Sequence, residues 1–141
     1  MTEVSSTVRR PGIGPAKVKQ LVEATMHSER IHNALISVAF VGKTAISRMN
    51  RKYLRHAGPT DVISFGMGRS ARDVPAVGDI YICPDVARTN AKRNRVPLSE
   101  ELARLVVHGA LHVAGHDHPE DDTRIQSEMW KRQERILAAI D

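Results

Sequence analysis

Cysteine, aromatic rings and long apolar runs are all scarce in this 141-residue sequence. The one cysteine, Cys83, excludes an internal disulfide framework and fits a reducing compartment. No apolar stretch approaches the ~20 residues that a membrane-spanning helix needs, and residues 1–15 lack the apolar core of a secretory signal. We therefore expect a cytoplasmic protein that makes no membrane contact. Aromatic residues form only 4% of the chain, which argues against an RNA-binding surface built from many stacked rings.

Acidic residues are fewer than basic ones, and the net charge is +5. Such a balance favours a polyanionic partner, nucleic acid above all. Two groups of basic residues stand at helical spacing: Arg48, Arg51, Lys52 and Arg55, and then Arg88, Lys92 and Arg95. Contact with RNA phosphates is one interpretation and an ordinary solvated helix face is the other. The sequence leaves both open.

The hydrophobic pattern predicts an α+β fold, in which a small mixed β-sheet packs against several α-helices. Residues 1–15, with two prolines and two glycines, are expected to form a flexible arm before a single domain of residues 16–141. We expect Cys83 and Trp130 to serve packing, and Asp61 to serve turn and strand-edge hydrogen bonding rather than catalysis. The predicted helices are 15–30, 43–56, 84–95, 99–114 and one from Pro119, and the predicted strands are 34–41, 61–67 and 77–83.

Four of the seven histidines lie within residues 108–118. His108 and His112 are four residues apart on a predicted helix, so both rings project from one side and can reach one metal ion. Gly115 ends that helix, and the following turn can return His118 as a third ligand, with His116 as the alternative. The alternative is that these histidines are ordinary polar residues that bind no metal. On a buried helix, however, each histidine without a hydrogen-bond partner would destabilise the fold by about 1–3 kcal/mol.

Three protein ligands leave the fourth position of a tetrahedral zinc site for water, which is the arrangement of a catalytic site. We therefore predict one Zn²⁺ per chain, on a buried helix and the turn after it. The same spacing occurs in metzincin proteases, where a glutamate after the first histidine is the general base. Gly109 stands at that position here. The sequence therefore favours a hydrolytic reaction other than peptide cleavage.

Residues 108–118, HGALHVAGHDH, resemble the H-G-x-L-H-L-x-G-x-D-H motif of the YbeY family of ribosomal RNA maturation endoribonucleases. Two further blocks, PTDVISF at 59–65 and GDIYIC at 78–83, resemble that family's P-T-D-V-L-S-F and G-D-I-x-I-C segments. The resemblance implies an α+β fold, zinc on three histidines, and hydrolysis of single-stranded RNA during ribosome maturation. The implied partners are ribosomal RNA or the small ribosomal subunit, with a ribosomal protein or a GTPase as further candidates.

One residue of the family pattern is missing. Many members carry an arginine directly after the tyrosine that is Tyr53 here, and that arginine faces the metal site. Leu54 occupies its place. Arg55 and Arg51 are the candidates to replace it, so a catalytic role is predicted for Arg55 together with His112. The predicted substrate-binding residues are Arg48, Arg51 and Lys52, and the predicted metal ligands are His108, His112 and His118.

The leading hypothesis is a zinc-dependent, single-strand-specific endoribonuclease that acts in ribosomal RNA processing. Either a water on the metal or the RNA 2′-hydroxyl is the nucleophile, and the residues do not separate the two. A second hypothesis is a non-catalytic ribosome assembly factor that binds RNA, in which zinc stabilises the fold. A metallopeptidase is a third, which Gly109 and the basic charge disfavour.

Overall fold

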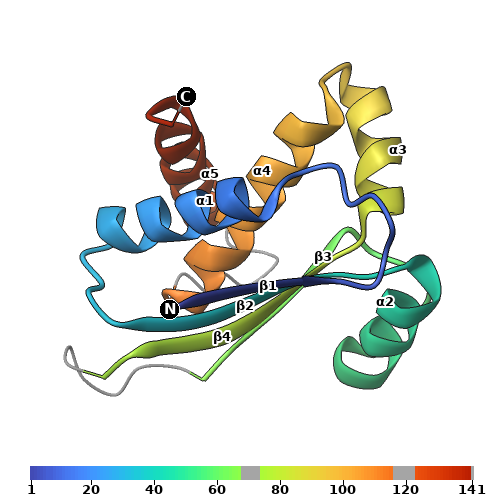
Figure 1. Ribbon diagram of the computed structural model, residues 1–141, viewed down its shortest axis with the longest axis horizontal. Coiled ribbons are helices and arrows are strands. Elements are labelled where there is room, and N and C mark those ends of the chain that lie inside the picture. Colours follow the sequence, from blue (N-terminus) through green and yellow to red (C-terminus); the bar gives the residue numbers. More distant parts are fainter. Residues whose placement is uncertain (68–73, 116–122, 141) are drawn as a thin grey trace.

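A computed structural model describes residues 1–67, 74–115 and 123–140 of the chain. Figure 1 shows a small sheet with helices on both sides. In the described part, no helix combines the length and apolar character that a membrane crossing requires. The strands are β1 (Thr2–Ser6), β2 (Ala34–Phe40), β3 (Val62–Gly66) and β4 (Ala76–Ile82). The helices are α1 (Pro15–Ser28), α2 (Lys43–Met49), the π-helical turn η1 (Asn50–Leu54), α3 (Pro84–Asn94), α4 (Leu98–Val113) and α5 (Thr123–Ala138).

The four strands form one mixed sheet in the order β1-β2-β4-β3. β2 runs parallel to both β1 and β4, while β3 is antiparallel to β4. The predicted α+β class with a small mixed sheet is confirmed. Alternate side chains along the strands enter two separate hydrophobic clusters, one on each face of the sheet.

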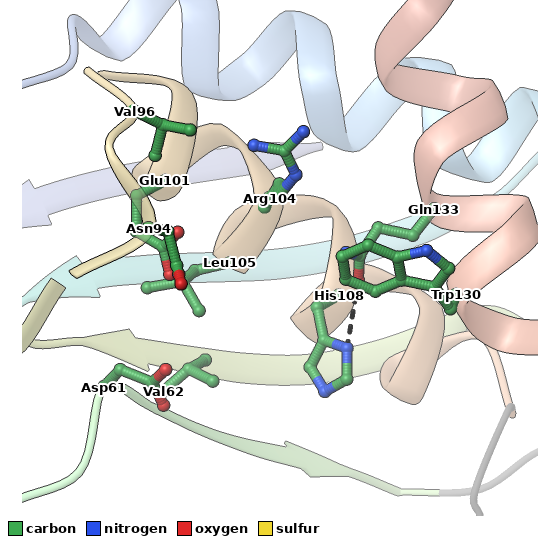
Figure 2. A pocket seen from close by; sticks show the side chains of 10 residues that line it. All are labelled: Asp61, Val62, Asn94, Val96, Glu101, Arg104, Leu105, His108, Trp130 and Gln133. Atoms are coloured by element: carbon green, nitrogen blue, oxygen red, sulfur yellow. Dashed lines mark hydrogen bonds between the residues drawn. The ribbon is translucent and has the colours of Figure 1, made fainter. Parts of the chain in front are cut away.

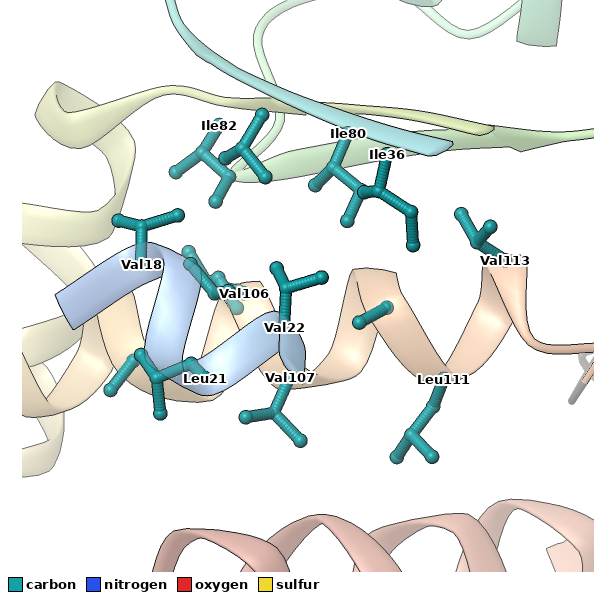
Figure 3. Packing of buried hydrophobic residues seen from close by; sticks show 14 of the residues in the cluster. Val18, Leu21, Val22, Ile36, Ile80, Ile82, Val106, Val107, Leu111 and Val113 are labelled. Atoms are coloured by element: carbon teal, nitrogen blue, oxygen red, sulfur yellow. The ribbon is translucent and has the colours of Figure 1, made fainter. Parts of the chain in front are cut away.

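The larger cluster lies between the sheet and the helices α1, α3, α4 and α5. Figure 3 shows its layers: Ile80 and Ile82 of β4 face α1 and α4, and Val107 and Leu111 point from α4 toward α5. Ten of the sixteen residues of α4 are buried, as the predicted all-round hydrophobicity requires. The smaller cluster lies on the other face, between the sheet and α2.

The expectation of a flexible arm at residues 1–15 is wrong for its first part, because Thr2–Ser6 form the edge strand β1. This strand pairs with β2 in a parallel ladder that places Val4 beside Val38. Val4 packs against the larger core, whereas the residues around it are polar and mostly exposed. An edge strand with one apolar side chain gives almost no periodic signal, which explains the error.

The predicted helix 43–56 also differs from the structure. α2 ends at Met49 and continues into η1, and Arg55 then adopts a left-handed backbone conformation with φ of 57°. The buried Asn50 stabilises this ending, since its side-chain amide donates to the Gly58 carbonyl oxygen at 3.0 Å. The α-helical spacing assumed for Arg48, Arg51 and Arg55 therefore does not hold.

Two glycines let α4 approach the sheet closely. A Cβ atom on Gly109 would lie 2.7 Å from Cγ2 of Ile80, and one on Gly78 would lie 2.6 Å from Cγ2 of Val113. Both distances are shorter than a van der Waals contact, so a larger residue at either position would push helix and sheet apart. Gly109 thus serves helix–sheet packing, at the position where metzincin proteases carry their glutamate base.

Candidate metal centre

His108 and His112 stand one turn apart on α4, and their rings converge. The ring centroids are 4.7 Å apart at an interplanar angle of 73°, and the two Nε2 atoms are 3.2 Å apart. Two nitrogens bound at ~2.0–2.1 Å to one tetrahedral zinc ion lie about 3.3–3.4 Å from each other. The separation of the two Nε2 atoms therefore fits a shared zinc ion.

Gln133 of α5 supports the first of these rings from behind. Nδ1 of His108 lies 3.1 Å from Oε1 of Gln133, which is only 4% exposed. An amide oxygen can only accept, so this contact assigns the proton to Nδ1 and leaves the lone pair on Nε2. The amide nitrogen of Gln133 donates to Oε2 of Glu134 at 3.3 Å, which fixes the orientation of the amide. A buried partner of this kind is typical behind a metal-binding histidine.

Arg104, one turn before His108 on α4, has two acidic partners. Arg104 donates to both carboxylate oxygens of Glu134, with Nη2 to Oε1 at 2.9 Å, and to Oε2 of Glu100 at 2.7 Å. These hydrogen bonds raise the pKa of Arg104 and lower the pKa of Glu134. The charge of Arg104 is therefore neutralised within the protein and holds α4 to α5.

The predicted third ligand, His118, and its alternative, His116, lie outside the described residues. Within residues 1–67, 74–115 and 123–140, no three histidine, cysteine or acidic side chains gather as a metal site. The structure thus brings together two of the three predicted ligands, and the third remains a prediction from the sequence.

His108 also faces a cavity of about 470 Å³, shown in Figure 2. Trp130 borders it and is 56% exposed, so less than half of its surface serves the packing expected of it. Glu101 lies in its wall and is 9% exposed; burial, and then the negative charge of Asp61, raise the pKa of the Glu101 carboxyl. Asp61 accepts a hydrogen bond from Asn90 at 3.2 Å, in line with its expected structural role. The lining residues are Asp61, Val62, Asn94, Val96, Glu101, Arg104, Leu105, His108, Trp130 and Gln133.

Sequence reasoning missed Glu101, Trp130 and Gln133 as site residues. A weak signal exists for Glu101, because it precedes His108 by seven residues and two helical turns place both on one side of α4. Gln133 and Trp130 lie on α5, and only the packing of α5 on α4 brings them to the histidines.

Three of the predicted basic residues meet in a different place, which we call the arginine hollow. Arg48, Arg51 and Arg55 line this space of about 600 Å³ together with His56. The hollow belongs to the α2–η1 segment, on the sheet face opposite to α4. None of these residues borders the His108 cavity. Lys52 turns away, with Nζ 5.2 Å from the centroid of the Tyr53 ring.

Comparison with known proteins gives one consistent result. Residues 13–141 match the model of a family described as Endoribonuclease YbeY. A Chlorobium luteolum protein named Endoribonuclease YbeY is 36% identical over 140 residues, which cover 98% of this chain and 96% of that protein. A protein of the same name from Staphylococcus epidermidis is 38% identical over 130 residues, 86% of this chain and 83% of its own length. The solution structure of TM1509 from Thermotoga maritima resembles the fold with a TM-score of 0.64 and 26% identity, over 99% of this chain and 91% of that one.

Proposed function

Because the chain belongs to the endoribonuclease YbeY family, we propose that it cleaves phosphodiester bonds of single-stranded RNA with the help of one zinc ion. His108 and His112 would hold this ion, and His118 would be its third protein ligand. The observation that carries the zinc proposal is the 3.2 Å separation of the two Nε2 atoms. Within this activity we propose ribosomal RNA, in the maturing small subunit, as the substrate; the net charge of +5 supports a polyanionic partner.

Zinc, when bound, supplies a Lewis acid that polarises a phosphodiester oxygen and lowers the pKa of water toward ~7. The chain's own residues do the positioning. Gln133 holds the His108 ring so that Nε2, and not Nδ1, points away from α5. The cavity beside His108 has room for part of an RNA strand. The nucleophile is either water or the RNA 2′-hydroxyl, and the identity of the product ends distinguishes them.

The arginine hollow is proposed as a binding site for RNA phosphates away from the metal. Its three arginines are exposed, and no ion pair in the described part of the chain involves them. Their separation from His108 argues for holding the substrate rather than stabilising the reacting phosphate. This placement also suits the second candidate, a non-catalytic assembly factor that binds ribosomal RNA.

The test measures zinc content and cleavage of an end-labelled single-stranded RNA for His108→Ala, His112→Ala, His118→Ala and His116→Ala. The first three variants should lose bound zinc, and their activity should fall by more than the roughly 10- to 100-fold that loss of an outer partner costs. His32→Ala, an exposed histidine before β2, is the matched control and should match the wild type.

Retained zinc and activity in His118→Ala, with loss of both in His116→Ala, would move the third ligand to His116. Zinc-loaded wild-type protein that binds the RNA without cutting it would reject the nuclease and favour the assembly factor. A 2′,3′-cyclic phosphate on the upstream product would identify the 2′-hydroxyl as the nucleophile. A 3′-hydroxyl on the upstream product with a 5′-phosphate on the downstream one would identify water.

A further inference from the structure

The cavity beside His108 contains two side chains that the metal chemistry does not use. Trp130 is one of them. It lies at the end of the cavity near His108, and more than half of its surface is exposed to solvent. Its neighbours on α5, Met129 and Gln133, are buried, whereas the Trp130 ring is not. The exposed ring instead offers an apolar face beside the proposed metal.

Glu101 is the second side chain, and Figure 2 shows it beside Asn94 at the other end of the cavity. It is 9% exposed, and in the described part of the chain no hydrogen bond reaches its carboxylate. The positive charge of Arg104 lowers the pKa of Glu101, but by less than burial raises it. Arg104 itself donates its hydrogen bonds to Glu100 and Glu134. A buried carboxylate without a donor is costly to keep, and a ligand with N–H groups would supply the missing donor.

The distance between the two ends suits one nucleotide. Glu101 and His108 are seven residues apart on α4, which corresponds to about 10.5 Å along the helix axis. A nucleotide spans a similar length from its phosphate to the far edge of its base. A phosphate near His108 would therefore place the edge of an attached base near Glu101, with Leu105 between them in the cavity wall.

We infer that this cavity is a nucleobase site for the nucleotide next to the cleaved bond. The part of the base near its ribose stacks on Trp130, at the His108 end, and the far edge of the base donates a hydrogen bond to Glu101, at the other end. This inference rests on the proposed function and adds base selectivity to it. Aromatic side chains bind the bases of single-stranded RNA in this way, and carboxylates accept from their N–H edges.

The chemistry of Glu101 selects among the bases. Guanine presents two adjacent N–H donors on its pairing edge, and one carboxylate can accept both. Uracil presents a single donor between two carbonyl oxygens, and those oxygens would repel the carboxylate. The site should therefore prefer guanine to uracil, and the preference should depend on Glu101 and not on the metal.

Trp130 is the only tryptophan of the chain, which makes a direct binding test possible. Protein labelled with ¹⁵N-tryptophan gives one indole N–H signal, and this signal is followed while a mononucleotide is added. Guanosine 5′-monophosphate contains no bond that the enzyme can cleave. It should shift the signal to saturation at lower concentration than uridine 5′-monophosphate, and inorganic phosphate should shift the signal less than either nucleotide.

Variants test the two contacts separately in zinc-loaded, full-length protein. Trp130→Ala should raise KM for a guanine-containing oligonucleotide by about 5- to 150-fold, the usual effect of losing one stacking contact. Trp130→Phe, which keeps a ring, should recover most of that loss, and Leu35→Ala is the control for loss of another exposed apolar side chain. Glu101→Gln should weaken guanosine 5′-monophosphate by about 10-fold or more, and uridine 5′-monophosphate much less.

The inference is overturned, and the nuclease function survives, if the wild type cleaves RNA while no nucleotide shifts the indole signal and Trp130→Ala keeps its KM. An equal response to all four nucleotides that Glu101→Gln leaves unchanged overturns the role of Glu101. If the protein cleaves no RNA but guanosine 5′-monophosphate still saturates the signal, the proposed function fails and the nucleobase site stands.

Discussion

The His108 cavity and the arginine hollow lie on opposite faces of one sheet and differ in almost every property. Among the described residues, the cavity wall contains two carboxylates, an exposed ring, a histidine and one arginine, which Glu100 and Glu134 neutralise. The hollow contains three arginines without an ion pair in the described part of the chain. In the arginine hollow, the protein's own arginines therefore supply positive charge that a polyanion can bind. The described lining of the cavity contains no lysine and no arginine without an acidic partner, so the proposed metal would be the source of positive charge there.

The largest expected effect concerns the cavity alone. Gln133→Leu removes the partner of His108 Nδ1 without adding charge, so the ring loses its fixed tautomer and orientation. Zinc affinity should fall by about 10- to 100-fold, measured by competition with a coloured chelator. Gln133→Glu keeps an acceptor and should retain zinc. Unchanged zinc affinity in the leucine variant would contradict the proposed role of Gln133.

An intermediate effect should appear in the hollow and leave zinc untouched. Replacing Arg48, Arg51 and Arg55 by glutamine removes three charges that RNA phosphates would otherwise neutralise. The slope of log K against log salt should shrink by about 0.7 for each lost phosphate contact, hence by up to about 2. Binding of a single-stranded RNA is measured at several salt concentrations. Arg88→Gln is the comparison, since Asp85 already pairs with Arg88 at 2.9 Å.

If the triple variant instead lost zinc, the two regions would not be independent. If its salt dependence equalled that of the wild type, the arginine hollow would have no part in RNA binding, and the net charge would act through other residues.

The smallest expected effect is on stability. Burial raises the folded-state pKa of Glu101, so its ionised form costs stability at neutral pH. Glu101→Gln should therefore be more stable than the wild type, by roughly 0.5–1 kcal/mol, at the lower end of typical stabilising substitutions. As pH falls through the raised pKa, the wild-type carboxyl takes up a proton and the difference should shrink. Thermal unfolding at neutral and acidic pH checks this, and a variant that is less stable at neutral pH would contradict it.

Features of the site that depend on local helical spacing were predictable from the sequence. Features that depend on how distant elements pack together were not. The convergence of His108 and His112 follows from helical spacing alone, since residues four apart share one side of a helix. Gln133 is 25 residues further along the chain, so its contact with His108 depends on how α5 packs on α4. The error at β1 has the same origin, because its identity as a strand comes from pairing with β2 rather than from its own pattern.

The basic residues show a different limit. Arg48, Arg51 and Arg55 do come together, although the α-helical spacing that predicted it is broken by the π-helical turn. Their position relative to the histidines depends on which face of the sheet α2 covers, and no local pattern encodes that choice.

The close seating of α4 on β4 restricts how this scaffold can change its chemistry. Introducing glutamate at Gly109, the step that would copy a metzincin base, would force its Cβ into Ile80 before the carboxylate reached any substrate. The helix would have to lift from the sheet, and the histidines would move with it. A single substitution at Gly109 would therefore not turn this protein into a metzincin-like peptidase, because the packing of α4 against β4 leaves no room for the glutamate side chain.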